Sequence, residues 1–316
     1  MPHAKPRLTV IDTDPGIDDA IGILLALASP EFDVAGITTV AGNIGIETTT
    51  RNACRLLAFA GREDIPVFQG ASSPLSRVGP EPLGLHGESG IGGVALPDPA
   101  RLPDSRHAVE WLADFLLDQP AGSVDVLALG PLTNLARLML EKPEAGRRIG
   151  RIIAMGGVIH EHGNVGPRSE FNLWADPEAA AVVLGSDVTR VLVPLDVTRR
   201  VRATRELASF LMKSGQPRAR MVAHLIQAYF ESPTAQDSRP LHDPCVMLFA
   251  LSPELFECED LALSVSVAEN EKAGELAIMV GGGAPVQVAL RVDAPAVLEL
   301  LTKRLSAAQS MNGFKI

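Results

Sequence analysis

The sequence predicts an α/β protein built on a single open, mostly parallel, Rossmann-like sheet flanked by helices, with additional helices and strands towards the C-terminus. Apolar runs of strand length alternate with helix-length segments through the first two thirds of the chain. This rhythm requires crossover connections and a parallel sheet that is covered on both faces. The 316 residues, of which 46% are hydrophobic, are enough for a large core, and no repeat or low-complexity segment divides them. We therefore expect one domain over residues 1–316.

The individual elements follow from apolar periodicity and from helix start signals. Strands are expected at 8–11, 34–39, 67–68, 124–129, 152–154 and 191–194, and helices at 18–28, 47–60, 108–117, 132–140 and 177–184. Asp18 and Asp19 suit the first turn of a helix, and Asp176-Pro177 is typical of a helix start. Beyond Val201 helices predominate, among them 221–230 and 245–251, followed by strands at 261–267, 276–280 and 286–292.

Composition excludes several classes of protein. A net charge of −10, from 28 basic and 38 acidic residues, argues against a nucleic-acid surface. Three scattered cysteines without a CxxC pair argue against a disulfide scaffold and a zinc site and fit a reducing compartment. The chain starts without a signal-peptide pattern, and no apolar run has membrane-spanning length. We expect a cytoplasmic protein that binds neither nucleic acid nor membranes.

An acidic segment lies between the first expected strand and helix, at the end of a parallel strand, where ligands bind in open sheets. It places Asp12, Asp14, Asp18 and Asp19 within eight positions. Like charges about 4 Å apart repel by roughly 4 kcal/mol at an effective dielectric near 20. A lone aspartate here would be a helix cap, but four together require a cation, a shared proton or hydrogen-bond donors. An all-oxygen set of this kind favours calcium or magnesium.

Other polar residues follow later strands. Asn43 comes after the second expected strand, where an asparagine is most often a turn former. In 127–134, a glycine allows close backbone approach, so that a main-chain carbonyl there can face a cation. Glu170 and Asn172 share one face if the chain is extended, which suits the vicinal hydroxyls of a sugar, although such pairs are more often surface residues.

Three further positions have an ordinary structural interpretation beside a functional one. In His242-Asp243-Pro244, Asp243 is expected to be the cap of the helix that follows. His86, in a glycine-rich loop, is typical of a lid but also of a solvated loop residue. Tyr229, the only tyrosine, lies on the expected helix 221–230, where a core or surface position is the default. No Walker A, GxSxG or HExxH motif is present.

Together these segments resemble the inosine-uridine-preferring nucleoside hydrolases. The most specific motif is Asp12-Thr13-Asp14-Pro15-Gly16-Ile17-Asp18-Asp19-Ala20. Five more blocks follow in the family's order: Ala41-Gly42-Asn43, Gly130-Pro131-Leu132-Thr133-Asn134, Met155-Gly156-Gly157, Glu170 to Pro177, and His242-Asp243-Pro244. The likeness extends from residue 8 to about residue 250. It implies a ribonucleoside hydrolase of nucleoside salvage or catabolism, assembled as a homodimer or homotetramer.

The resemblance also implies a calcium ion and a general base. Matching ligands are Asp14, Asp18, Asp19, Asp243 and the main-chain carbonyl of Leu129. Asp14 matches the base that takes a proton from a calcium-bound water. The chemistry fits an N-ribosidic bond, because its cleavage passes through an oxocarbenium-like ribosyl cation that carboxylates stabilise. Attack from the face opposite the base predicts inversion at the anomeric carbon.

Substrate contacts are implied in the same way. The residues matching those that hold the ribose are Asp18, Asn43, Met155, Asn164, Glu170 and Asn172, with Phe171 beside the sugar. His86 and Tyr229 match the region over the base, and His242 matches the histidine that serves the leaving nucleobase. The segment from Met155 to Asn164 is one residue longer than the family pattern.

Two alternatives remain beside the hydrolase. A magnesium-dependent phosphohydrolase also carries Asp-x-Asp after its first strand but needs a lysine for the phosphate, and neither Lys142 nor Lys213 lies in an expected strand-end turn. A non-catalytic nucleoside- or ribose-binding protein would keep the pocket without turnover. Purine, pyrimidine and ribosylnicotinamide-like substrates all stay open, because the loops at 76–93 and 221–241 select the base.

Overall fold

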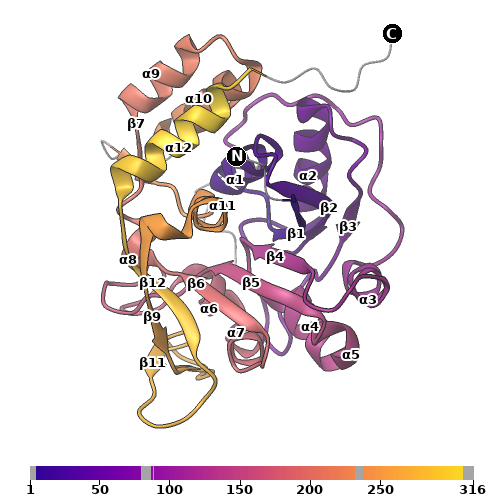
Figure 1. Cartoon of the computed structure of the whole chain (residues 1–316), viewed down its shortest axis with the longest axis vertical. Coiled ribbons are helices and arrows are strands. Elements are labelled where there is room, and N and C mark those ends of the chain that lie inside the picture. Colours follow the sequence, from indigo (N-terminus) through magenta and orange to yellow (C-terminus); the bar gives the residue numbers. More distant parts are fainter. Residues whose placement is uncertain (1–4, 80–86, 88, 232–237, 309–316) are drawn as a thin grey trace.

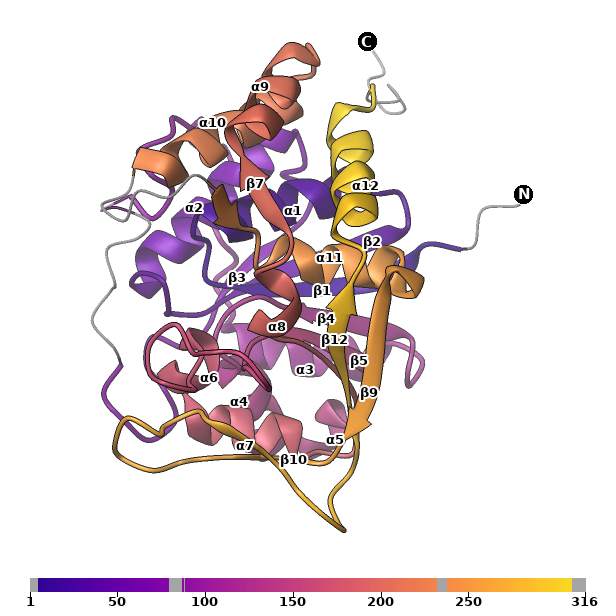
Figure 2. The same ribbon diagram turned by 90° about the vertical axis from the view of Figure 1, so that its left-hand side faces the viewer.

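Eight strands form the central sheet of the computed structural model, in the order β3-β2-β1-β4-β5-β6-β12-β9 (Figure 1). They are β1 (Arg7–Thr13), β2 (Phe32–Thr39), β3 (Val67–Gln69), β4 (Val124–Ala128), β5 (Ile149–Met155), β6 (Thr189–Val193), β9 (Phe256–Leu261) and β12 (Val286–Val292). All neighbours are parallel except β12 and β9, which run antiparallel at one edge (Figure 2). The structure describes residues 5–79, 87, 89–231 and 238–308.

The order of the strands reverses between β1 and β4. From β1 the chain builds outward through β2 and β3, and then continues on the other side of β1 with β4, β5 and β6. Asp12 near the end of β1 is level with Thr38 of β2 and Ala128 of β4. The loops that follow β1, β2 and β4 therefore start side by side, and a crevice for ligands is expected at this point.

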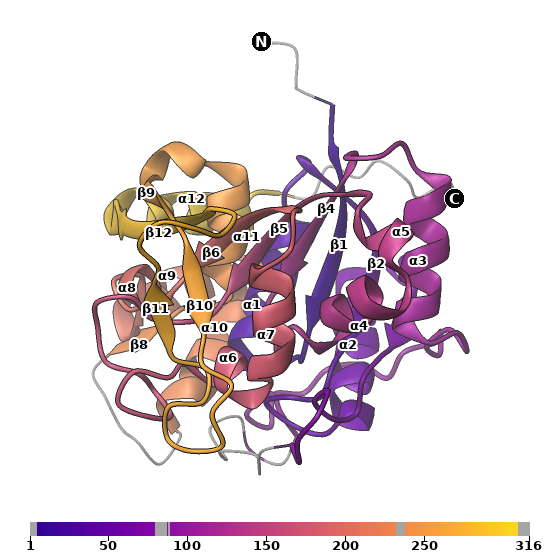
Figure 3. The ribbon, with the colours of Figure 1, turned by 90° about the horizontal axis from the view of Figure 1, so that it is seen from below.

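Helices cover both faces of the sheet (Figures 1 and 3). On one face lie α1 (Ile17–Leu27), α2 (Ile46–Ala60), α10 (Pro217–Glu231), α11 (Pro244–Leu251) and α12 (Ala294–Ser306). On the other lie α3 (Ala108–Asp118), α4 (Thr133–Glu141), α5 (Pro143–Gly146) and α7 (Pro177–Leu184). Alternate strand residues feed the two cores: Ile11 of β1 packs into the first and Val10 into the second. Burial on both faces explains the continuous apolar runs in the sequence.

Short elements complete the chain. They are α6 (Phe171–Ala175), α8 (Leu195–Thr198), α9 (Arg205–Lys213), a 3-10 turn (Pro253–Leu255), and the strand pairs β7 (Arg202–Thr204) with β8 (Ser238–Pro240) and β10 (Leu263–Val265) with β11 (Leu276–Ile278). Among the described helices, none is both long and apolar enough to span a membrane.

The predicted fold class is confirmed, and most expected elements are present within a few residues of their predicted bounds. The strand expected at 261–267 is wrong as a single element, because the chain forms β9 before it and the short β10 within it. β9 was missed because it is an edge strand with exposed acidic residues, Glu257, Glu259 and Asp260, and therefore lacks an apolar run.

Candidate active site

Asp14 directly follows β1 and its carboxylate is held between two neighbouring loops. The backbone N–H of Asn43, after β2, donates to Asp14 Oδ2 at 2.6 Å. A Cβ at Gly42 would overlap Oδ2, and a Cβ at Gly130, after β4, would overlap Oδ1. The carboxylate is buried, and Oδ1 has no hydrogen-bond partner within the described residues. Glycine at both positions is what lets this carboxylate lie at the crevice between β1 and β4.

Asp19 holds the turn that joins β1 to α1. Its Oδ1 accepts a hydrogen bond from Thr13 Oγ1 at 2.6 Å, and its Oδ2 accepts from the backbone N–H of Gly16 at 2.9 Å. Asn43 Nδ2 also donates to Oδ2, at 3.0 Å. Asn43 is therefore more than a turn former, because it links the loop after β2 to both Asp14 and Asp19.

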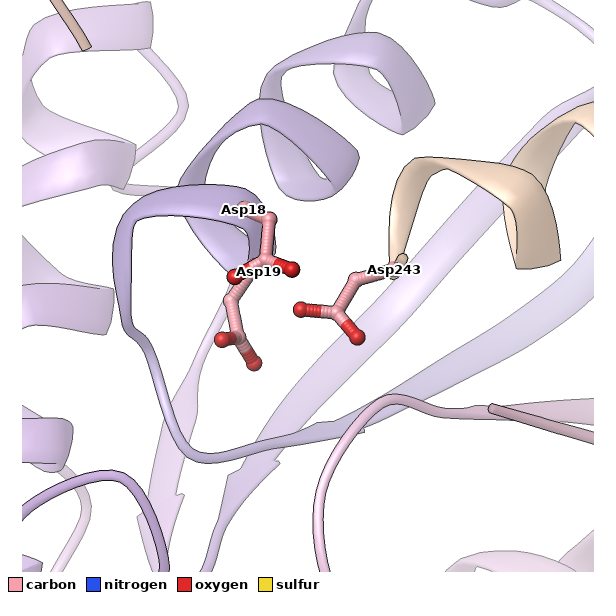
Figure 4. Close-up of side chains that lie close together, drawn as sticks. All are labelled: Asp18, Asp19 and Asp243. Carbon is pink, nitrogen blue, oxygen red and sulfur yellow. The ribbon is translucent and has the colours of Figure 1, made fainter. Parts of the chain in front are cut away.

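Asp18, Asp19 and Asp243 form an acidic cluster, and Figure 4 shows their side chains close together at the starts of α1 and α11. One oxygen from each carboxylate lies within 4.8 Å of the others, and all three residues are buried. Asp243 occupies the expected cap position of α11, but its side chain makes no capping hydrogen bond. The predicted position of Asp243 at the start of α11 is therefore confirmed, but its carboxylate belongs to the cluster and does not bond the helix end.

Burial makes these carboxylates difficult to ionise together. Loss of solvent, reinforced by the charge of Asp19, raises the pKa of Asp18 to about 7. The same causes raise the pKa of Asp14 well above its usual range, and burial with the charges of Asp18 and Asp19 does so for Asp243. A cation among them would reverse the effect, because opposite charge favours the ionised form. The donor set consists of hard oxygens, which fit calcium or magnesium.

A pocket adjoins the cluster. Its lining residues come from the start of α1, from the ends of β2, β4 and β5 and the loops that follow them, from α6 and α10, and from the start of α11: Asp18, Asn43, Leu129, Met155, Asn164, Glu170, Phe171, Asn172, Tyr229, His242 and Asp243. Every one of them was singled out from the sequence. Asp14 and Asp19 are not in the wall, and His86 lies outside the described residues.

Glu170 and Asn172 line the pocket from a local backbone structure that the sequence did not predict. The expectation of an extended chain here is wrong, because Glu170 caps the short helix α6 and Asn172 lies in its first turn. The Glu170 carboxylate accepts from the backbone N–H groups of Gly157 at 2.9 Å and Asn172 at 3.0 Å. Burial raises the pKa of Glu170 to about 7. Helical rather than extended geometry thus points both side chains at the same cavity.

The side-chain amide of Asn172 donates to the main-chain carbonyl of Leu129 at 2.6 Å and to that of Met155 at 3.2 Å. Asn164 Oδ1 accepts a hydrogen bond from the backbone N–H of Phe171 at 2.9 Å. This bond holds the end of the loop between Met155 and Asn164 beside the pocket. The Leu129 carbonyl has a second lone pair with which it can still face a cation.

Three supporting residues, Thr38, Asn134 and Thr198, were given no role from the sequence, and Asp12 was named only as one of four neighbouring carboxylates. Asp12 Oδ1 accepts from Thr38 Oγ1 and Asn134 Nδ2, and burial raises the pKa of Asp12 to about 6. His242 Nδ1 lies 2.8 Å from Thr198 Oγ1. Asn134 belongs to the motif that begins at Gly130, and Asp12 belongs to the acidic segment, so both could have been considered from the sequence. Nothing in the sequence marks Thr198, since it is far from His242 along the chain.

We expect Gly130→Ala to lower kcat for the reaction of this site by about 100-fold, the effect of a misplacement near 1 Å. The added methyl would overlap Asp14 Oδ1 and displace the carboxylate. Steady-state kinetics and thermal unfolding would be measured together. Gly45→Ala is the matched control, because its Cβ meets nothing within 4 Å. Full activity of a folded Gly130→Ala protein would show that Asp14 has room to move.

Comparison with known proteins supplies independent information. A family model described as inosine-uridine preferring nucleoside hydrolase matches residues 9–299. The pyrimidine-specific ribonucleoside hydrolase RihA of Citrobacter koseri is 39% identical over 94% of this chain and 97% of its own length. A plant nucleoside hydrolase, PpNRh1, superposes with a TM-score of 0.88 at 34% identity, covering 96% of this chain and 100% of that one. The purine-preferring ribonucleoside hydrolase from Gardnerella vaginalis gives a TM-score of 0.88 at 29% identity, covering 95% and 98%.

Proposed function

Since this chain belongs to the inosine-uridine preferring nucleoside hydrolase family and is a ribonucleoside hydrolase, we propose that the pocket beside the acidic cluster binds the nucleoside next to a calcium ion. One observation carries this proposal: Asp18 and Asp243 belong both to the cluster and to the pocket wall. A cation held by the cluster would therefore lie at the wall of the pocket, next to whatever fills it. Family membership favours this function over a phosphohydrolase or a non-catalytic binding protein.

The residues proposed to hold the ion are Asp14, Asp18, Asp19, Asp243 and the Leu129 carbonyl. Such a set suits calcium, which accepts six to eight oxygen ligands in irregular geometry, better than magnesium, which demands a near-ideal octahedron. Calcium, when bound, would supply the positive charge that orients a water molecule and lowers its pKa. Support for a cation comes from the buried, mutually repelling carboxylates and from the unpartnered Asp14 Oδ1.

Asp14 is the proposed general base. Its Oδ2 is fixed by the N–H of Asn43, and the absence of a Cβ at Gly42 and Gly130 leaves room for the carboxylate between their loops. A base held in this way takes the proton of the attacking water as the new C–O bond forms at the anomeric carbon. The electron pair of the breaking C–N bond leaves with the nucleobase. Attack from the face opposite the base inverts the anomeric carbon.

The ribose is proposed to lie against Asn43, Met155, Asn164, Glu170, Phe171 and Asn172, with Asp18 reaching a hydroxyl. Glu170 and Asn172 are buried and held by backbone hydrogen bonds, so they are already oriented before the sugar arrives. Buried carboxylates beside the ring stabilise the ribosyl cation in the transition state. Tyr229 and His86 are proposed to face the base, and His242 to stabilise it as it leaves.

The whole chain, residues 1–316, is proposed to form one domain that assembles as a homodimer or homotetramer. The family match over 9–299 supports a single functional unit. The three cysteines form no disulfide, which supports the reducing environment of the cytoplasm.

Free ribose released from inosine, uridine, cytidine and adenosine tests the proposal. Metal-free protein should release almost none, and added calcium should restore the rate more than added magnesium does. Elemental analysis of the protein as purified gives the metal content. Ribose release that persists in protein shown to be metal-free would contradict the calcium proposal. Absence of release from every nucleoside, with calcium bound, would contradict turnover at this site, and a phosphate-release assay then examines the phosphohydrolase alternative.

A further inference from the structure

Thr198 joins the site through a single hydrogen bond. It is the last residue of α8, which follows β6, and it is fully buried. Its Oγ1 lies 2.8 Å from Nδ1 of His242, and His242 lines the pocket. Within the described part of the chain, this ring nitrogen is the only hydrogen-bond partner of the Thr198 hydroxyl.

The direction of this hydrogen bond follows from the inventory of donors and acceptors. A threonine hydroxyl has one proton to donate, and a neutral imidazole has one N–H and one bare nitrogen. If Nδ1 carried the hydrogen, the hydroxyl would have to accept it, and its own proton would be buried without an acceptor. An unmade hydrogen bond in a buried place is costly. The hydroxyl therefore donates to Nδ1, and the ring hydrogen of neutral His242 is on Nε2.

We propose that Thr198 is a positioning residue that holds His242 in the Nε2–H tautomer, so that Nε2 donates a hydrogen bond to the nucleobase as it leaves. The inference rests on the proposed function, in which His242 stabilises the leaving base. Negative charge develops on the base while the C–N bond breaks, and a donor fixed in advance stabilises that charge without reorienting. The other tautomer would present a bare nitrogen lone pair to the same charge and repel it.

The dependence of kcat on the leaving group separates this role from a purely structural one. The test compares the best natural nucleoside with 4-nitrophenyl β-D-ribofuranoside, whose phenolate departs as a stable anion without help. Thr198→Val, which keeps the side-chain shape, should lower kcat on the nucleoside by at least about ten-fold. KM, and the rate on the nitrophenyl riboside, should change far less. Thr198→Ser is the matched control, because it keeps the hydroxyl and should restore most of the nucleoside rate.

Nitrogen NMR on protein labelled with ¹⁵N-histidine gives a readout that does not depend on turnover. At a pH where the ring is neutral, the His242 signals, identified by their loss in His242→Gln, should show hydrogen on Nε2. In Thr198→Val the tautomer should shift towards a mixture. Hydrogen on Nδ1 in the unmodified protein would overturn the proposal even if the valine variant failed to fold. An equal loss on both substrates in Thr198→Val would overturn it as well.

A His242→Ala variant tests the proposed role of His242 separately from the inference about Thr198. If it loses rate on the nucleoside but keeps it on the nitrophenyl riboside, the proposed role of His242 stands. Thr198→Val must then lose rate on the nucleoside and keep it on the nitrophenyl riboside. If it does not, the inference about Thr198 is wrong while the role of His242 stands. If His242→Ala loses both rates equally, the leaving-group role of His242 is itself wrong and the inference falls with it.

Discussion

Replacement of Asp14 by asparagine should lower kcat for ribose release by at least about 100-fold, the usual contribution of a positioned general base. The carboxamide has nearly the shape of the carboxylate and fits between Gly42 and Gly130. Its oxygen can still accept from the N–H of Asn43. The carboxamide cannot take a proton from the attacking water. It also offers the cation one negative charge fewer. Steady-state kinetics at saturating calcium would measure the loss.

Two controls make the Asp14 result specific. Asp125→Asn removes another buried carboxylate of the same sheet, one paired with Arg7 and Arg151 away from the pocket. It should lower the unfolding temperature and leave kcat nearly unchanged. Measured calcium content separates lost metal from lost base. An Asp14→Asn protein that is folded, holds calcium and keeps a tenth or more of the original kcat would mean that another group takes the proton.

Removal of calcium should make the stability of the protein fall as the pH rises from about 5 to about 8. The pKa of Asp18 is raised to about 7 in the folded chain, and the pKa values of Asp14 and Asp243 are raised as well. In the unfolded chain aspartate has a pKa of about 3.9. Between these values the folded chain binds more protons than the unfolded chain, so increasing pH favours unfolding. The stabilisation is complete below the unfolded pKa and is lost as the pH passes through the folded values.

If the cluster binds calcium as proposed, added calcium should reverse this trend, because a bound cation favours the ionised carboxylates. At a concentration 100 times its Kd, a ligand specific for the folded state adds about 2.7 kcal/mol to the free energy of unfolding. Thermal unfolding followed by circular dichroism, with chelator and with excess calcium, would give both curves. Asp18→Asn is the matched variant and should make the metal-free curve less steep. Metal-free stability that stays level or rises towards pH 8 would show that the cluster is not repulsive.

Much of the fold was predictable from local patterns. The runs that became β1, β2, β4 and β5 are largely buried on both faces, so apolar residues predominate in their sequences. The helix from Pro177 to Leu184 was predicted at its observed bounds, because Asp176 caps it and Pro177 cannot continue a preceding helix. β9 escaped prediction because a charged edge strand lacks this signature. The helix that starts at Phe171 was missed because its five residues are too few for helical periodicity to show.

By itself the sequence determined which chemical groups are available to the site, because the residue types and their order along the chain are local facts. Carboxylates after the first strand, an amide after the second and a His-Asp pair before a late helix needed no coordinates to be recognised. Only the tertiary structure decided which of them meet. Asp243 joins Asp18 and Asp19 because α11 packs on α1, and Thr198 reaches His242 because α8 ends beside the start of α11. Such contacts depend on the order of strands and the packing of helices, which periodicity within one element does not encode. The same holds for Gly42 and Gly130, whose missing side chains matter only once the Asp14 carboxylate lies between their two loops.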